Sequence, residues 1–195
     1  GNELSTITNG GTTAQAQASV LDLYDNTRLR YPMQKDGKGF KEVTGFDAFD
    51  KMVEAAVAGK SFALLTATVN SPTTLAIIKE FIDKHPGSRH VQYDAVSYSG
   101  MLLANEACYG KKAIPSYHFD KAKVIVSLGA DFLGTWLSPA EFNNQYSQNR
   151  KIKGEKPELS KHFQFESMIS LTGSNADDRY THKPSETGAV ALALL

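Results

Sequence analysis

Residues 121–136 read KAKVIVSLGADFLGTW, and this stretch decides the fold that the sequence predicts. The apolar segment VIVSL, residues 124–128, contains three β-branched side chains and predicts a strand. Gly129 ends the strand, and the carboxylate of Asp131 follows two residues later. Because ligands of open α/β sheets bind beyond the carboxyl ends of parallel strands, this strand end is a candidate ligand site.

Strands and helices alternate along the rest of the chain, which is typical of parallel βαβ units. We expect strands at 61–69, 89–96, 122–129 and 162–171, with short ones near 40–43 and 180–183. We expect helices at 46–58, 70–85, 99–110, 138–150 and 185–195, with caps from Thr44 or Asp47, Ser71, Ser138 and Ser185. The pattern predicts an α/β, Rossmann-like three-layer domain with a mainly parallel sheet.

The two ends of the chain predict its domain organisation. Residues 1–18 are small and polar, and we expect them to form a flexible lead-in. The Rossmann-like domain would then span residues 19–195. The chain starts at Gly1 without a methionine and closes on the apolar run GAVALALL. We therefore expect a fragment of a larger multidomain protein, truncated at its C-terminal end.

Composition excludes several classes of function. The 21 basic and 21 acidic residues give a formal net charge of zero, so no basic field favours nucleic acid or an anionic membrane surface. The single cysteine, Cys108, excludes an intrachain disulfide and a cysteine-ligated cluster within these residues. Cys108 lies among apolar residues and is expected in the core. No apolar run approaches the roughly 20 residues that span a bilayer.

Two further patterns have ordinary structural interpretations. The segment AGKS at 58–61 resembles the end of a phosphate-binding loop, but a helix precedes it and a strand follows it. That order is reversed for the motif, so Gly59 is interpreted as the end of a helix. The five histidines show no metal-ligand spacing, and we expect them at surface or loop positions.

The strand ends also resemble those of a known family, the molybdopterin oxidoreductase superfamily. The segments that carry the likeness are RLRYPMQKDGKGFKEVTGFDAFDKMVEAA, FDKAKVIVSLGADFLGTWLSP and ESMISLTGSNADDRYTHKPSETGAVALALL. Within it, the segments ADFLGTWLSP, QYSQNR, FES and TGSNADDR resemble the molybdopterin-like iron–sulfur subunit of bacterial alternative complex III, a quinol-oxidising respiratory complex.

The resemblance assigns roles to four residues. Ser97 occupies the position of the molybdenum ligand, and Gly129 that of the pterin-loop glycine. Asp131 begins the pair that replaces the family's Asn-Pro, and its carboxylate would repel a pyrophosphate, while Phe132 could fill the space. Glu166 stands where the family has an acidic residue that contacts a guanosine ribose.

The resemblance implies a function with open alternatives. The first is a non-catalytic, cofactor-free scaffold in a quinol-oxidising electron-transfer complex. Its partners would be other domains of the parent chain and other subunits, without nucleic acid or direct membrane insertion, on the periplasmic side of a bacterial inner membrane. The alternatives are part of an active molybdenum enzyme, binding molybdopterin guanine dinucleotide with Ser97 near the metal, or an unrelated nucleotide-binding Rossmann-like domain.

Overall fold

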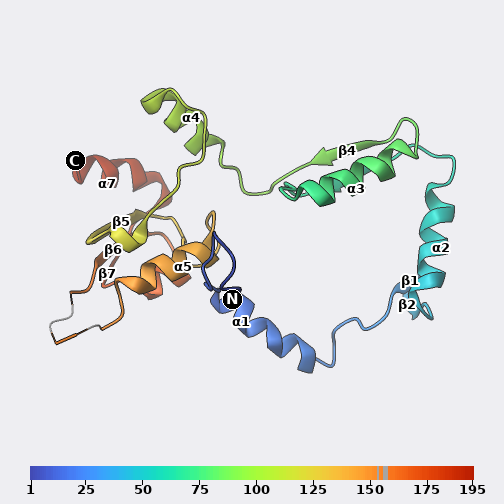
Figure 1. Cartoon of the computed structure of the whole chain (residues 1–195), viewed down its shortest axis with the longest axis horizontal. Coiled ribbons are helices and arrows are strands. Elements are labelled where there is room, and N and C mark those ends of the chain that lie inside the picture. The colour runs from blue at the N-terminus through green and yellow to red at the C-terminus, as the bar shows by residue number, and fades with distance from the viewer. Residues whose placement is uncertain (153, 156–157) are drawn as a thin grey trace. The chain divides into compact units, whose positions relative to one another are not determined.

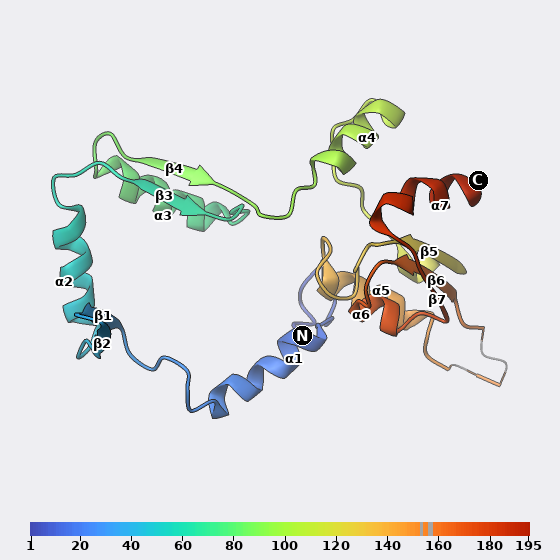
Figure 2. The ribbon, with the colours of Figure 1, turned by 180° about the vertical axis from the view of Figure 1, so that it is seen from behind.

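The computed structural model describes residues 1–152, 154–155 and 158–195. Contacts within the chain divide it into two units, one of residues Gly1–Asn26 and Pro115–Leu195, the other of residues Thr27–Ile114. Figures 1 and 2 show a mixture of helices and strands in each unit. The predicted α/β character is confirmed, because two of the sheets are parallel and helices connect their strands.

The first unit is built on a three-stranded parallel sheet. Its strands are β5 (Val124–Leu128), β6 (Lys161–Glu166) and β7 (Asp178–Thr181), hydrogen-bonded in that order. Its helices, in chain order, are α1 (Ala14–Ala18), η1 (Ser19–Tyr24), η2 (Phe119–Lys121), α5 (Pro139–Gln148), α6 (Leu171–Ser174), η3 (Pro184–Glu186) and α7 (Thr187–Ala193). In the register of the sheet, Gln164 pairs with Ser127 on one side and with Arg179 on the other.

Helix α5 covers one face of this sheet and supplies two of the five buried residues of the hydrophobic cluster. Phe142 and Tyr146 are four residues apart, so they share one face of the helix, and both are buried. Phe132, from the loop after β5, is 1% exposed and stacks on Phe119 at 4.3 Å between ring centroids. Phe132 therefore packs in the hydrophobic core beside the strand end and does not line the cleft there.

Strand β6 buries polar residues on the face that meets α5. His162 and Gln164 are 0% exposed and Glu166 is 4% exposed, whereas the alternate residues Phe163 and Phe165 lie on the opposite face. His162 lies within the aromatic core, 5.4 Å from the ring centroid of Phe132. The prediction that the histidines occupy surface or loop positions is therefore wrong for His162.

The N-terminal segment that was predicted as a flexible lead-in contacts α5. Asn144 Nδ2 donates to the carbonyl oxygens of Thr8 and Asn9, both at 3.0 Å. Thr13 caps α1 by accepting from Ala16 N at 3.0 Å. Ser185 was expected to cap the last helix, but it lies inside η3, and α7 begins after Glu186 without a side-chain cap.

The second unit contains an antiparallel hairpin, a parallel strand pair and three helices. In chain order these are β1 (Met33–Asp36), β2 (Gly39–Glu42), α2 (Phe46–Val57), β3 (Ala63–Thr66), α3 (Pro72–Asp83), β4 (Arg89–Gln92) and α4 (Ser99–Tyr109). Ser71 caps α3 as predicted, by accepting from Thr74 N. Gly45, with φ 82°, occupies the cap of α2, so Thr44 and Asp47 do not cap that helix.

Two further features of the second unit differ from expectation. Cys108 is exposed on α4, because the described part of that helix buries no residue, and its prediction as a core residue is wrong. The hairpin was expected as loop with one short strand. Gly37-Lys38 supplies its turn, since Gly37 adopts φ 60°, a conformation that glycine accepts without strain.

The strands of the described residues form three separate sheets: β1–β2, β3–β4 and β5–β6–β7. A continuous Rossmann-like sheet over residues 19–195 therefore stays a prediction. Across the same residues, no helix combines the length and the apolar composition needed to cross a membrane.

Candidate functional site

Three of the four predicted site residues meet at the carboxyl end of the sheet in the first unit. Gly129 directly follows β5, and Glu166 is the last residue of β6. Together with Asp131 they line a cleft of about 540 Å³. Ser97 belongs to the second unit, where its Oγ accepts from Ser99 N at 3.2 Å.

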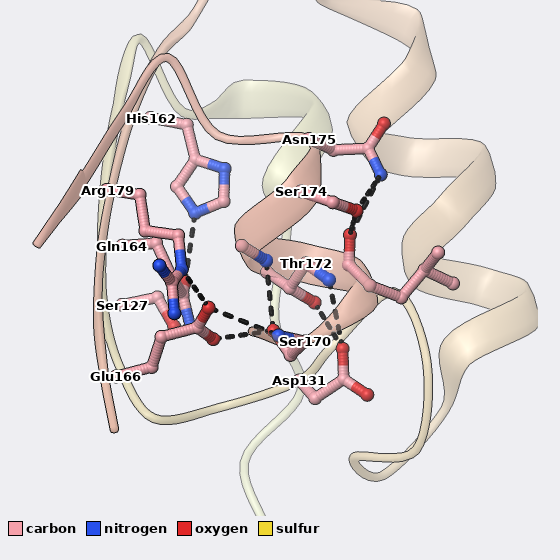
Figure 3. A network of polar contacts seen from close by, with 12 residues as sticks. Ser127, Asp131, His162, Gln164, Glu166, Ser170, Thr172, Ser174, Asn175 and Arg179 are labelled. Atoms are coloured by element: carbon pink, nitrogen blue, oxygen red, sulfur yellow. Dashed lines mark hydrogen bonds and ion pairs between the residues drawn. The ribbon is translucent and has the colours of Figure 1, made fainter. Parts of the chain in front are cut away.

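Asp131 ties the loop after β5 to helix α6. Its Oδ1 accepts from Thr172 N at 3.0 Å and from Thr172 Oγ1 at 2.8 Å, and its Oδ2 accepts from Thr135 Oγ1 at 3.2 Å (Figure 3 shows the Thr172 contacts). Thr172 is fully buried, and its Oγ1 also accepts from Leu133 N at 2.9 Å. Gly134 lies so close to the Asp131 carboxylate that a Cβ at this position would overlap it. The carboxylate is thus a structural clamp for the loop.

Glu166 accepts hydrogen bonds at both of its carboxylate oxygens. Oε1 accepts from Arg179 Nε at 2.5 Å and from Ser170 N at 3.1 Å. Oε2 accepts from Ser170 Oγ at 2.6 Å and from Gln164 Nε2 at 3.2 Å. Burial alone would raise the pKa of Glu166, but the bonds from Arg179 and Ser170 outweigh it and lower the pKa, so the group is an anion.

The Glu166 carboxylate also excludes a side chain from the neighbouring helix. Its Oε1 occupies the place that a Cβ at Gly173 would take, and Gly173 is buried. Ser170 caps α6 by accepting from Gly173 N at 2.9 Å. The backbone N–H groups of Ser170, Thr172 and Gly173, which could otherwise face an anion, are therefore already bonded to protein oxygens.

A second ionic contact lies at the other end of the sheet. Arg150 forms a two-pronged ion pair with Asp177, from Nη1 to Oδ2 at 2.7 Å and from Nη2 to Oδ1 at 2.9 Å. Asp177 Oδ2 also accepts from His162 N at 2.7 Å. The Arg150 hydrogen bonds lower the pKa of Asp177 from 3.8 to about 2.

Sequence reasoning did not single out Arg150, His162, Gln164, Thr172 or Asp177 as residues of this network. One signal could have found part of it. Residues 162–166, HFQFE, alternate polar and apolar side chains in a predicted strand, so the three polar residues had to share one face. In the structure α5 covers that face.

The described residues do not fit a pyrophosphate at this cleft. Its lining contains two carboxylates, Asp131 and Glu166, and no lysine or arginine among the described residues. Glu166 has donors on both oxygens, so a ribose hydroxyl would have to displace Arg179, Ser170 or Gln164. Across the same described residues, no group of three or more potential metal ligands comes together.

No protein-family model matches the chain, and no curated protein matches it.

Proposed function

We propose that the chain contributes a non-catalytic structural domain to a larger protein, and that it acts as a scaffold within a quinol-oxidising electron-transfer complex. The quinol-oxidising context, the periplasmic side of a bacterial inner membrane and the partner subunits come from the resemblance of ADFLGTWLSP, QYSQNR and TGSNADDR to alternative complex III. The cofactor-free role is supported by the contacts of the strand ends.

One observation carries this proposal. Asp131 and Glu166, the two carboxylates at the strand ends, accept protein hydrogen bonds on both of their oxygens. A ligand site keeps acceptors or donors free for its ligand, whereas a structural site uses them internally. The internal use favours a scaffold over a dinucleotide-binding site.

The first test is direct binding. Trp136 is the only tryptophan in the chain and belongs to the first unit, in the aromatic cluster beside Tyr117 and Phe142, so its fluorescence reports the unfolding of that unit. Adding guanosine diphosphate should leave the thermal unfolding midpoint of the first unit unchanged, both in the wild type and in Asp131→Asn. A saturable rise in the wild type would overturn the cofactor-free role, since a ligand of the native state stabilises it.

The second test uses the parent protein in its bacterial membrane. A destabilising change in the first unit, such as Gly173→Ala, should reduce the amount of assembled complex and leave quinol oxidation per assembled complex unchanged. Loss of turnover in fully assembled complex would contradict the scaffold role.

The molybdenum-enzyme alternative has one observation in its favour. Gly129 is exposed at the rim of the cleft and adopts φ 70°, which leaves its backbone open to a close approach. Metal analysis and pterin fluorescence of the native parent protein separate the two functions. Stoichiometric molybdenum or tungsten would replace the scaffold proposal with the enzyme, with Ser97, Gly129 and Glu166 as its site residues.

A further inference from the structure

A continuous line of polar groups runs through the core between α5 and the sheet. His162 Nδ1 lies 3.1 Å from the Tyr146 hydroxyl, and this hydroxyl lies 3.0 Å from the carbonyl oxygen of Asn175. At its other ring nitrogen, Nε2, His162 lies 3.3 Å from Gln164 Oε1. Gln164 Nε2 then reaches Glu166 Oε2 at 3.2 Å, as Figure 3 shows for the sheet half of the line.

The chemistry of the line assigns the proton on His162 Nε2. The Glu166 carboxylate can only accept, so Gln164 must turn its amide nitrogen toward it. The amide oxygen of Gln164 then faces His162 Nε2, and an oxygen acceptor requires a hydrogen there. In the neutral imidazole, Nε2 is therefore the protonated nitrogen and Nδ1 is an acceptor.

This assignment leaves the Tyr146 hydroxyl with one hydrogen and two acceptors when His162 is neutral. The acceptors are His162 Nδ1 and the Asn175 carbonyl oxygen, and the carbonyl's other contact is a long one, 3.5 Å from Arg150 Nη2. When His162 is protonated, Nδ1–H donates to the tyrosine oxygen, and the hydroxyl hydrogen is free to bond the carbonyl. In the imidazolium form every group in the line has a short partner, whereas in the neutral form either His162 Nδ1 loses its donor or the carbonyl keeps only the long contact from Arg150.

We propose that His162 is a two-state proton switch. When His162 is protonated, the Tyr146 hydroxyl donates to the Asn175 carbonyl. When His162 is neutral, the hydroxyl can donate either to His162 Nδ1 or to that carbonyl. The switch links α5, through Tyr146, to the turn after α6, through Asn175. Because both residues line a second cleft of about 380 Å³, a change of proton state alters the polar lining of that cleft.

The charges around His162 set the direction in which the switch responds to pH. Burial and Arg150, just after α5, disfavour the imidazolium, whereas Gln164 and Glu166 of β6 and Asp177, after α6, favour it. Burial is the largest of these effects, and the pKa of His162 is lowered from its ordinary value. The groups that act on the ring are thus Tyr146 from α5, Arg150 just after that helix, Gln164 and Glu166 from β6, and Asp177 from the turn. The neutral imidazole therefore dominates at neutral pH, and acidification produces the imidazolium, in which the Tyr146 hydroxyl donates to the Asn175 carbonyl.

The switch is independent of the proposed function, because a scaffold and an enzyme could both contain it. The test is an NMR titration of the His162 ring nitrogens in the full chain, with Trp136 fluorescence to verify folding. In wild type, the neutral ring should show the hydrogen on Nε2. A neutral ring with its hydrogen on Nδ1 would overturn the proposal without any variant.

Tyr146→Phe provides the second arm of the test. The proposal expects a downward shift of the His162 pKa, since the variant removes the acceptor for the Nδ1–H of the imidazolium. A tyrosine that only donates to a neutral ring would stabilise the neutral form, and its removal would shift the pKa upward; that result overturns the switch. Tyr180→Phe is the matched control, because Tyr180 is half-exposed and stacks on Phe165, which lies on the opposite face of the sheet, and should leave the titration unchanged.

Discussion

Replacing Asp177 by asparagine tests how much the first unit depends on its two-pronged ion pair. The change removes the negative charge that Arg150 contacts at 2.7 and 2.9 Å and keeps the size of the side chain. Lowering the carboxyl pKa from 3.8 to about 2 corresponds to about 2 kcal/mol of stability, at about 1.4 kcal/mol per pH unit. The Asp177 side chain is 29% exposed, so solvent screens part of this electrostatic stabilisation. We therefore expect Asp177→Asn to lower the free energy of unfolding by about 1–2 kcal/mol at neutral pH.

The pH dependence follows from the direction of the pKa change. A carboxyl whose pKa is lower in the folded state stabilises the fold above its unfolded pKa, here 3.8, and this contribution is lost as the pH falls through about 2. The difference in free energy of unfolding between wild type and Asp177→Asn should therefore be largest at neutral pH and should shrink progressively on strong acidification. The assay is urea unfolding followed by the fluorescence of Trp136 at several pH values.

The neighbouring residue provides the control for this experiment. Asp178 pairs with Lys161 at 2.7 Å, but the two side chains are 40% and 48% exposed, so the charge is screened. Asp178→Asn should lower the stability less than Asp177→Asn does. Equal losses in the two variants, or a gap that stays constant down to pH 2, would refute the assignment of the stability to the Arg150 contact.

Three further changes test the contacts at the strand ends and in the core, all by urea unfolding. Gly173→Ala should cost about 1–3 kcal/mol, because its Cβ would overlap the Glu166 carboxylate, whereas Gly188→Ala has open space and should stabilise α7 by up to about 1 kcal/mol. Thr172→Val should cost about 1–3 kcal/mol, since it leaves a buried backbone N–H without its acceptor; a neutral result would show that the hydroxyl is not structural. Wild type should lose stability as the pH falls below 6.5, because folding disfavours protonation of His162, and His162→Gln should flatten that slope; an unchanged slope would contradict the buried assignment.

Local patterns predicted most elements of the fold. The alternation of apolar runs with capped helices placed α2, α3, α4, α5 and β5 within two residues of their observed bounds, whereas the strand predicted at 162–171 ends at Glu166. Local patterns did not decide which side of a strand is buried, because that depends on where the next helix packs. His162 was therefore expected at a surface or loop position, while α5 brings Phe142 and Tyr146 over the face that carries it.

The sequence predicted where the candidate site lies, but it did not predict whether the hydrogen-bond acceptors there are free for a ligand. The carboxyl end of a parallel strand follows from the order of elements, and Gly129, Asp131 and Glu166 do line one cleft there. Whether their acceptors are free depends on donors such as Arg179 and Thr172, which lie 13 and 41 residues away along the chain. Sequence spacing carries no information about such distant partners.

The two close approaches between a carboxylate and a glycine have a consequence for evolution. Asp131 fills the space beside Gly134, and Glu166 fills the space beside Gly173. Within each pair, the glycine cannot take a side chain while the carboxylate keeps its place, because the two would overlap. In a family of such sequences, positions 131 and 134 should covary, and so should 166 and 173. A lineage that shortens both acids would gain volume at the strand ends.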